Sequence, residues 1–263
     1  MVENAKSISE VTSLLEKSIT PLGRREEISL CSANGRICAE HIYSPLSLPT
    51  SNNAAVDGFA FHYEWSTSHP NHVYDIVAEI RAGHPYSGKL LPGQAVAIFT
   101  GAIVPEELNC IVMQENCILE EKKRVRIPFA PKKGLNIRMA GENLRKGEVI
   151  IKDGQRITAA DIGQLSAIGR SKIFCYSELS IGVLSTGDEV MDTYNTKPFS
   201  KLRPGQLYDT NRPMLKAMVT KDNHFCSDYG IIIDDKTSLQ EGYEKVLSEN
   251  NIVISTGGAS QGI

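Results

Sequence analysis

The sequence predicts a mixed α/β protein of several domains, in which a β-rich domain is inserted into a helical and extended stem and a parallel α/β domain follows. Three observations predict this class. Residues 179–258 repeat a step of apolar strand and polar turn, with helical stretches between the strands. Residues 73–127 alternate short apolar strands with turns, which is typical of a β domain. At 263 residues the chain also exceeds the roughly 150 residues of one average domain.

The last third of the chain has the pattern of parallel strands joined by helices. Apolar strands are predicted at residues 179–184, 225–233 and 251–255, and each runs into a polar turn. Apolar residues at helical spacing follow the first two strands, and Thr210 or Asn211 is the expected cap of the first helix. Right-handed crossovers bring the carboxyl ends of such strands together, where a ligand crevice forms. The polar turns therefore predict a binding edge.

The flanks of the β-rich segment predict two helices. Ser7 and Glu10 have capping-box spacing ahead of an apolar stripe that ends near Pro21. Thr158, with an acidic residue three positions on, is expected to cap a second helix that ends at Gly169. We expect the two helices to pack side by side. The predicted domains are a stem of residues 1–50 and 144–171, an inserted β-rich domain of residues 51–143, and an α/β domain of residues 172–263.

Composition excludes several function classes. Hydrophobic residues make up 41% of the chain and charged residues 22%, as in ordinary globular proteins. The 31 acidic and 28 basic side chains give a net charge of -3, which argues against nucleic acid as a partner. No apolar run approaches the roughly 20 residues that span a bilayer, and the N-terminus lacks a hydrophobic signal core. We therefore expect a cytoplasmic protein without a membrane partner.

The cysteines and histidines do not form a clear metal motif. The six cysteines lie far apart and include no CxxC pair, which favours buried free thiols over a zinc site or a disulfide framework. His62, His69 and His72 fall close together, but a proline and an asparagine follow His69 as in a turn. A surface loop explains these histidines more simply than a metal site does.

Three features of the β-rich region leave two interpretations open. Asp57 lies among small residues, and is either a turn residue bonded to nearby amides or a carboxylate held at a site, for instance through a metal. Thr100 and Gly101 end an apolar strand, either as a simple turn or as a hydroxyl beside a backbone that a ligand can approach. The basic residues between 122 and 138 are either solvated hairpin residues or an anion-guiding rim.

Seven motifs, taken together and in order, resemble those of one family. They are NNAAVDGFAF (52–61), IFTGA (98–102), NIRMAGEN (136–143), STGDEV (185–190), GQLYDTN (205–211), GIIIDD (230–235) and ISTGG (254–258). With these motifs the chain resembles the molybdopterin molybdenumtransferase family, which comprises MoeA and the E domain of gephyrin. The resemblance extends over nearly the whole chain.

The resemblance implies an activity and an assembly. The protein would insert molybdate into adenylated molybdopterin and release AMP, with a divalent cation such as Mg²⁺. It would form an elongated homodimer, with an active site between the α/β domain of one subunit and the β-rich domain of the other. A molybdopterin adenylyltransferase is the implied protein partner.

The resemblance also implies a set of site residues. The catalytic positions are Asp57, Thr100, Glu142, Glu189 and Asp234, with Asp57, Glu189 and Asp234 as metal ligands or orienters of water. The pterin-binding positions are Thr186, Gly187, Asp188, Asp209, Asn211, Ser255, Gly257 and Gly258. The chemistry suits these residue types, because glycine-rich turns offer backbone amides to phosphates and carboxylates hold the Mg²⁺ that neutralises a phosphate. Thr100 is expected to position a neighbour by hydrogen bonding.

The sequence departs from the family pattern at two positions and at its end. Asn143 stands where the family usually has Asp, and Asn52 where many members have Asp; an amide keeps the shape and loses the charge. The chain ends at Ile263, before the family's remaining strands, helices and basic residues. We therefore expect an incomplete sheet with an exposed edge and little molybdate insertion by this chain alone. The alternatives are a non-catalytic pterin-binding remnant and a scaffold for protein partners.

Overall fold

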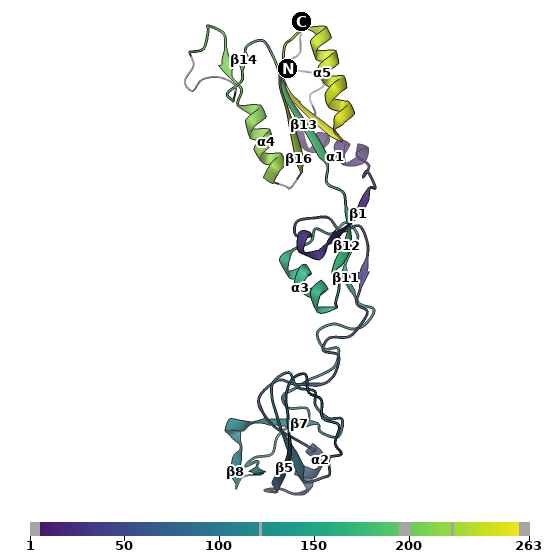
Figure 1. Cartoon of the computed structure of the whole chain (residues 1–263), viewed down its shortest axis with the longest axis vertical. Helices are drawn as coiled ribbons and strands as arrows, with labels where there is room; N and C mark the ends of the chain where they lie inside the picture. Colours follow the sequence, from purple (N-terminus) through teal and green to yellow (C-terminus); the bar gives the residue numbers. More distant parts are fainter. Residues whose placement is uncertain (1–5, 121–122, 195–200, 222–223, 258–263) are drawn as a thin grey trace. The chain divides into compact units, whose positions relative to one another are not determined.

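The structure is a computed structural model that describes residues 6–120, 123–194, 201–221 and 224–257 (Figure 1). The chain divides into two compact units, one formed by His41–Ile151 and the other by Met1–Glu40 together with Lys152–Ile263. The mixed α/β fold predicted from the sequence is confirmed. The finer division into three domains stays a prediction. Among the described residues, no helix has both the length and the apolar composition that a bilayer crossing requires.

The His41–Ile151 unit is built on a six-stranded sheet with the strand order β7-β4-β6-β5-β9-β8. All neighbouring strands run antiparallel except β5 and β6, which are parallel. The strands are β4 (Gly58–Phe61), β5 (Val73–Ile80), β6 (Gln94–Ile98), β7 (Cys110–Met113), β8 (Ile118–Glu120) and β9 (Arg124–Arg126). The β-rich character predicted for this region is therefore correct.

Both faces of this sheet are buried, and the alternation of side chains along β4 shows why. Phe59 and Phe61 point to one face, where they pack with Tyr74 and Val112, whereas Ala60 points to the other face. Successive residues of a strand point to opposite faces, so a strand that is apolar at every position fits a sheet covered on both sides.

Short elements complete this unit. The helix α2 (Tyr63–Ser68) follows β4, and the 3-10 turn η2 (Gln114–Asn116) follows β7. Two small antiparallel pairs lie outside the sheet: β3 (Asn53–Ala54) with β10 (Ile137–Arg138), and β2 (Ile42–Tyr43) with β11 (Val149–Ile151).

The second unit begins with the predicted N-terminal helix. The helix α1 (Ile8–Ser18) is capped by Ser7, whose Oγ accepts from Glu10 N at 3.3 Å while Ser7 N donates to Glu10 Oε2 at 2.7 Å. The same reciprocal arrangement of Thr158 and its third neighbour caps α3 (Ala159–Ala167). Both predicted capping boxes are confirmed.

The predicted packing of these two helices is wrong. No residue of α1 is buried, whereas α3 buries Leu165 and packs against the 3-10 turn η1 (Leu30–Ser32). An antiparallel strand pair, β1 (Arg25–Ser29) with β12 (Lys172–Tyr176), lies in the same unit. The apolar stripe of α1, with Leu14 and Leu15, therefore faces solvent in the single chain.

The α/β part of this unit contains the three parallel strands that the sequence predicts. The strand order is β16 (Phe225–Ile232), β13 (Ser180–Thr186), β17 (Ile252–Thr256). The helices α4 (Asn211–Lys221) and α5 (Lys236–Glu249) connect them, and a short parallel pair, β14 (Val190–Met191) with β15 (Leu207–Tyr208), lies in the β13–α4 connection.

The two helices pack on opposite faces of this sheet (Figure 1). Ile181 and Val183 of β13 pack with Val219 of α4. Gly182, which points to the other face, lies so close to α5 that an added Cβ would approach Val246 Cγ1 to 2.6 Å. This arrangement leaves the carboxyl ends of the strands free of helix, as expected for right-handed crossovers.

Candidate functional site

The first group of predicted site residues lies where β4 begins and β6 ends. The pairing of Gly58 with Ile98 places Asp57 directly beside the residues that follow β6. One oxygen of Asp57, Oδ1, accepts from Thr100 N at 2.8 Å and from Thr100 Oγ1 at 2.7 Å. These two bonds, the backbone one first, lower the pKa of Asp57, so the carboxylate is ionised at neutral pH. The structure thus brings Asp57 and Thr100 together.

A third segment joins this pair through the backbone. Ala54 N donates to Ala102 O at 2.9 Å, and Ala55 N donates to Asn136 O at 2.9 Å. The β3–β10 pairing aligns Ile137 with Ala54 and Arg138 with Asn53. Residues 52–57, 100–104 and 136–143 therefore form one hydrogen-bonded loop cluster, although they are far apart in the sequence.

Glu142 and the two asparagines of this loop cluster have local partners. Glu142 is exposed, and its Oε2 accepts from Met139 N at 2.9 Å, which closes its own turn. Asn52 Oδ1 accepts from Ala140 N at 2.9 Å, so the amide at this position still makes a carboxylate-type acceptor bond. Asn143 is anchored through its backbone, which donates to Leu48 O at 3.0 Å.

The second group lies at the carboxyl ends of β13, β16 and β17. Gly187 N donates to Ile232 O at 3.4 Å, Asp234 N donates to Asp188 Oδ1 at 3.1 Å, and Thr186 Oγ1 donates to Thr256 O at 3.2 Å. These bonds connect the turns after all three strands. We call residues 185–189, 233–235 and 255–257 the strand-end cluster.

At two positions of the strand-end cluster, neighbouring protein atoms leave room only for glycine. Gly187 has φ +130°, and an added Cβ would lie 2.6 Å from Glu189 Oε2. Gly257 has φ +102°, and its Cβ would lie 2.3 Å from Thr186 Oγ1 and 2.6 Å from Thr186 O. Both positions favour glycine for backbone reasons as well as for lack of space. Close packing within the strand-end cluster therefore fixes both turns.

The acidic residues of the strand-end cluster divide into two kinds. Asp235 caps α5, because its Oδ1 accepts from Thr237 N at 3.0 Å and from Ser238 N at 3.1 Å, and these contacts with Ser238 lower its pKa. Asp188, Glu189 and Asp234 are exposed. Of the two neighbouring acids in the GIIIDD motif, Asp234 is thus the one whose carboxylate faces solvent rather than a helix end.

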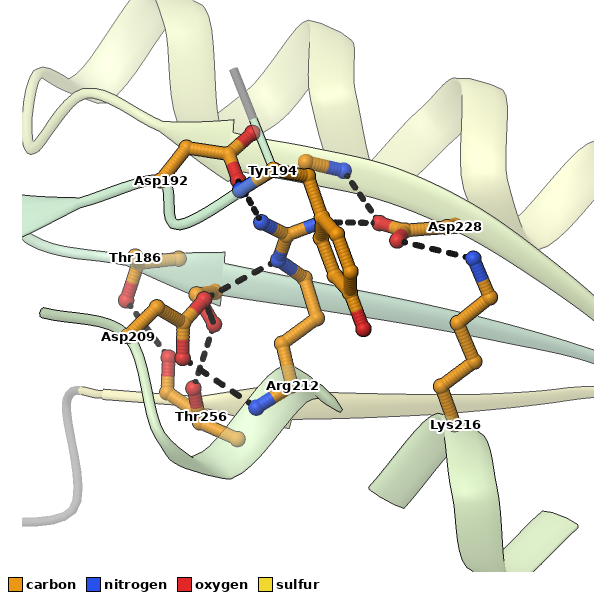
Figure 2. A network of polar contacts seen from close by, with 10 residues as sticks. Thr186, Asp192, Tyr194, Asp209, Arg212, Lys216, Asp228 and Thr256 are labelled. Carbon is orange, nitrogen blue, oxygen red and sulfur yellow. Dashed lines mark hydrogen bonds and ion pairs between the residues drawn. The ribbon is translucent and has the colours of Figure 1, made fainter. Parts of the chain in front are cut away.

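A buried arginine lies beside the strand-end cluster (Figure 2). Arg212, in the first turn of α4, is 2% exposed and pairs with three carboxylates from different segments. Its Nε lies 2.9 Å from Asp209 Oδ2, its Nη2 lies 2.9 Å from Asp192 Oδ1, and its Nη1 bonds to Asp228 on β16. We call these four residues the Arg212 network.

The pKa values in the Arg212 network follow from burial and pairing. Burial by itself raises the pKa of Asp209 and of Asp228. Hydrogen bonds from Ser185 and Arg212 more than offset burial at Asp209, and those from Arg212 and Gly230 N, with the nearby cations, do so at Asp228, so both pKa values are lowered. Burial lowers and the carboxylates raise the pKa of Arg212, with a net increase. Arg212, Asp209 and Asp228 are therefore charged at neutral pH, and the buried cation and the carboxylates compensate each other.

Asp209 is 4% exposed, which places a predicted pterin-binding carboxylate inside the protein. Its Oδ1 accepts from Arg212 N at 3.1 Å, so it provides the first turn of α4 with the acceptor that the sequence assigned to Thr210 or Asn211. Its Oδ2 accepts from Ser185 Oγ at 2.8 Å, and the Ser185 hydroxyl is also 2.8 Å from Thr256 Oγ1. Asp209 thus links α4 to the ends of β13 and β17.

The remaining predicted pterin-binding residues differ in their placement. Asn211 and Ser255 are exposed, at the start of α4 and near the end of β17. Gly258 lies outside the described residues. Asp57 and Thr100 belong to one compact unit, whereas Glu189 and Asp234 belong to the other.

The described residues contain no group of three or more His, Cys, Asp or Glu side chains arranged to hold a metal ion. Mg²⁺ commonly takes only one or two protein carboxylates and completes its shell with water and substrate phosphates. The exposed carboxylates at the end of β13 and β16, joined through the bond of Asp234 N to Asp188, fit that donor type.

The histidines that the sequence brought together have structural contacts. His62 Nδ1 accepts from Trp65 N at 3.4 Å at the start of α2, and His69 stacks on Trp65 with ring centroids 3.8 Å apart. His72 Nε2 lies 3.4 Å from Gly93 O. These contacts agree with the interpretation of the segment as a turn.

Of the four residues in the Arg212 network, only Asp209 was predicted from the sequence as a site residue. A signal was present, because Asp228 interrupts an otherwise largely apolar strand and a charge buried there requires a partner. Its partner, Arg212, follows the GQLYDTN motif directly, but only the fold brings the two residues together.

A parallel sheet with acidic and glycine-bearing turns at the strand ends defines an α/β protein that binds its ligand at that edge. Two models of known protein families match this chain. The model described as "MoeA N-terminal region (domain I and II)" matches residues 6–169, and the model described as "Probable molybdopterin binding domain" matches residues 182–262. The chain therefore belongs to the MoeA family, as the seven motifs indicate.

Individual relatives agree with the family models. The chain is 34% identical to a molybdopterin molybdenumtransferase of Haemophilus influenzae and 35% identical to one of Nostoc sp., in each case over 90% of this chain. These matches cover 57% and 54% of the relatives, so the chain spans a little over half the length of these proteins.

Among solved structures, the chain is similar to a molybdopterin biosynthesis MoeA protein from Pyrococcus horikoshii OT3. The sequences are 28% identical, the TM-score is 0.85, and the match covers 95% of this chain and 65% of that chain. Another solved structure of a molybdopterin biosynthesis MoeA protein from Pyrococcus matches with a TM-score of 0.80 at 27% identity.

Proposed function

We propose that the chain acts in molybdenum cofactor biosynthesis, as a molybdopterin molybdenumtransferase that inserts molybdate into adenylated molybdopterin with release of AMP. The observation that carries this proposal is the strand-end cluster, which gathers the STGDEV, GIIIDD and ISTGG motifs on one sheet edge. The relatives that bear the name of this activity support it.

The strand-end cluster is proposed to bind the pterin and its phosphates. Thr186, Gly187 and Gly257 lie in the glycine-bearing turns at the strand ends, and backbone amides at such turns can donate to phosphate oxygens. Asp188, Asn211 and Ser255 are proposed to contact the pterin, whose ring carries hydrogen-bond donors and acceptors. Asp209 and Gly258 belong to the same proposed set, and Asp209 would act by holding the turns in place.

The loop cluster is proposed to contribute the catalytic carboxylate. Thr100 holds Asp57 ionised through two hydrogen bonds to one oxygen, so Thr100 would position Asp57 rather than react. Glu142, on the same loop cluster, would line the site. Asp57 and Thr100 are in one unit and Glu189 and Asp234 in the other, and a homodimer in which the two groups come from different subunits would complete the site.

A divalent cation fits the proposed reaction. When bound, Mg²⁺ neutralises charge on the phosphate that is cleaved. We propose Glu189 and Asp234, together with Asp57, as its protein ligands or as the groups that orient its water. These side chains would otherwise repel an anionic substrate at the same place, because all three are carboxylates.

The apolar stripe of α1 supports the proposed homodimer. Ile8, Leu14, Leu15 and Ile19 are all exposed in the single chain, and contiguous exposed apolar side chains on a capped helix favour an interface. A cytoplasmic location and a molybdopterin adenylyltransferase as the supplier of the adenylated substrate are parts of the same proposal.

The test is AMP release from adenylated molybdopterin in the presence of molybdate and Mg²⁺. Asp57→Asn should lower the rate by about 100-fold or more, since it removes a charge that acts on the reacting phosphate. Asp75→Asn is the matched control, because Asp75 is an exposed carboxylate of the same unit that pairs with Arg124 on the sheet. Once AMP release by the unsubstituted protein is measured, an Asp57→Asn rate equal to that of Asp75→Asn would remove Asp57 from the catalytic set.

Binding without turnover is the second candidate function. It is favoured by the division of the proposed residues between the two units, since the strand-end cluster can bind a pterin without the loop cluster. A calorimetric titration with adenylated molybdopterin separates the candidates. Saturable binding without AMP release by the unsubstituted chain would support the second.

A further inference from the structure

A cavity of about 440 Å³ lies in the unit formed by Met1–Glu40 and Lys152–Ile263, at the amino ends of the parallel strands. Leu179, His224 and Asn251 line it, and they directly precede β13, β16 and β17. The strand-end cluster lies at the opposite ends of the same strands. β13 has seven residues at about 3.3 Å each, so roughly 20 Å separates the cavity from that cluster. The cavity is therefore a second place at which this unit can hold a ligand.

Backbone hydrogen bonds join the segments that form the cavity wall. Ser177 N donates to Arg24 O at 3.0 Å, which fixes the segment between α1 and β1 against the one between β12 and β13. Tyr176 N donates to Ile37 O at 2.8 Å. The wall is thus preformed, and the volume falls within the range of small-molecule pockets, about 300–1,000 Å³.

Part of the cavity wall is hydrocarbon. Pro21, Leu22, Ile37 and Leu179 line it. Leu22 is 55% exposed, and Ile37 and Leu179 are half-buried, so a molecule in the cavity can reach all three side chains. Removing such a surface from water favours binding. The wall therefore suits a ligand with a hydrocarbon body.

Three arginines and one glutamate also line the cavity, and one arginine is committed to the glutamate. Arg36 donates from Nη2 to Tyr176 O at 2.9 Å and pairs with Glu26, and its Nε lies 3.6 Å from Glu178 Oε1. Glu178, the acid of the wall, is thus compensated within the protein. The cations that remain for a ligand are the other two arginines.

Arg24 and Arg156 are these accessible cations. Both are exposed, and neither takes part in an ion pair in the part of the chain that the structure describes. Arg156 is held at the wall, because its Nη1 donates to Gly35 O at 3.0 Å. A guanidinium carries five N–H donors, so this bond leaves others for a ligand. Arginine binds carboxylates through charge-assisted and often bidentate hydrogen bonds.

We propose that this cavity binds a small carboxylate with a hydrocarbon chain, with the chain against Leu22, Ile37 and Leu179 and the carboxylate at Arg24 and Arg156. A cationic ligand of the same shape would be repelled by the two arginines. The site shares no residue with the strand-end cluster or the loop cluster. The inference therefore goes beyond the proposed transferase reaction and is tested separately from it.

The probe is octanoate, titrated into the full chain by calorimetry. Octanamide has the same chain with a neutral head, and butyrate has the same head with four carbons fewer. Octanoate should bind saturably. Octanamide should bind at least about threefold more weakly, because the charge-assisted bonds to arginine are lost. Butyrate should bind at least about tenfold more weakly, because it buries less hydrocarbon. Octanoate that fails to bind below its micelle concentration overturns the proposal, as does octanamide that binds equally well.

One pair of variants locates the hydrocarbon chain, since the apolar stripe of α1 is an alternative surface for octanoate. Leu22 in the cavity and Leu15 on α1 are matched, at 55% and 54% exposed. Leu22→Ala should weaken octanoate at least about twofold, and Leu15→Ala should leave it unchanged. The reverse result would place octanoate on α1 and overturn the proposal.

A second set of variants locates the carboxylate. Arg24→Gln and Arg156→Gln should each weaken octanoate at least about twofold, and the double variant at least about fivefold, whereas octanamide should change less than about twofold. Arg203→Gln is the matched control, because Arg203 is an exposed arginine of the same unit that lies outside the cavity. Octanoate binding that is unaltered in the double variant overturns the proposal. An equal loss of octanamide binding also overturns it, since the arginines would then act on the fold and not on the carboxylate.

Discussion

Replacing Arg212 with methionine should destabilise the α/β part of the chain far more than the same substitution one helical turn later. Arg212 and Lys216 lie on the same helix, α4, and both contact Asp228. They differ in burial: Arg212 is 2% exposed, whereas the Lys216 side chain is 40% exposed and its Nζ lies 3.4 Å from Asp228. The pair therefore isolates the effect of burial from that of the ion pair.

The magnitudes follow from the partners that each change leaves behind. Arg212→Met removes the buried cation from Asp209, Asp192 and Asp228, whose side chains are 3%, 18% and 18% exposed, and leaves Asp228 with only the partly exposed Lys216. Removing one partner of a buried ion pair costs about 3–5 kcal/mol, because the remaining charge is uncompensated. Lys216→Met removes a partly exposed pair and should cost about 0–1 kcal/mol. The first loss is a large part of the roughly 5–15 kcal/mol that stabilises a domain.

Hydrogen exchange measures this difference locally, which suits a chain with two units. Amides of β13 and β16 should lose about 100-fold or more of their protection in Arg212→Met and less than about tenfold in Lys216→Met. Adding Asp228→Asn to Arg212→Met should restore part of the protection, since it removes one uncompensated charge. Equal losses in the two single variants would refute the reasoning from burial.

Two further predictions concern the same unit. The pKa of Asp228 is lowered in the folded state, so its ionised form contributes stability that is complete above the unfolded pKa of about 3.9 and is lost as the pH falls below it. Acid titration monitored by circular dichroism should therefore show a steeper loss of folded protein for the unsubstituted chain than for Asp228→Asn. Parallel curves would contradict this prediction. Gly257→Ala should destabilise the strand-end cluster by about 1–3 kcal/mol or more, since the added Cβ would contact Thr186. Gly205→Ala is the control, because Gly205 has φ +85° and nothing within 4 Å of an added Cβ, so only the backbone cost remains. Denaturant titration measures both variants, and an equal loss of unfolding free energy would argue against the close contact.

Local chemistry explains which parts of the fold could be predicted. The capping boxes at Ser7 and Thr158 and the short strands within residues 73–127 are set by residues close in sequence, and the structure confirms them. The packing of α1 against α3 was predicted wrongly, because an apolar stripe shows that a helix needs a partner but does not identify it. The direct bond between Asp57 and Thr100 follows from strand register, which joins two motifs that the sequence separates.

The sequence by itself determined the family, the order of the strands and helices, and the turns that carry acids and glycines, because these depend on residue type and short spacing. Only the tertiary structure decided that Asp209 is buried against Arg212 and that Arg24 and Arg156 line one cavity. The physical reason is that burial and the pairing of charges depend on contacts between distant segments, and a linear pattern does not specify these contacts until the sheet register brings the segments together.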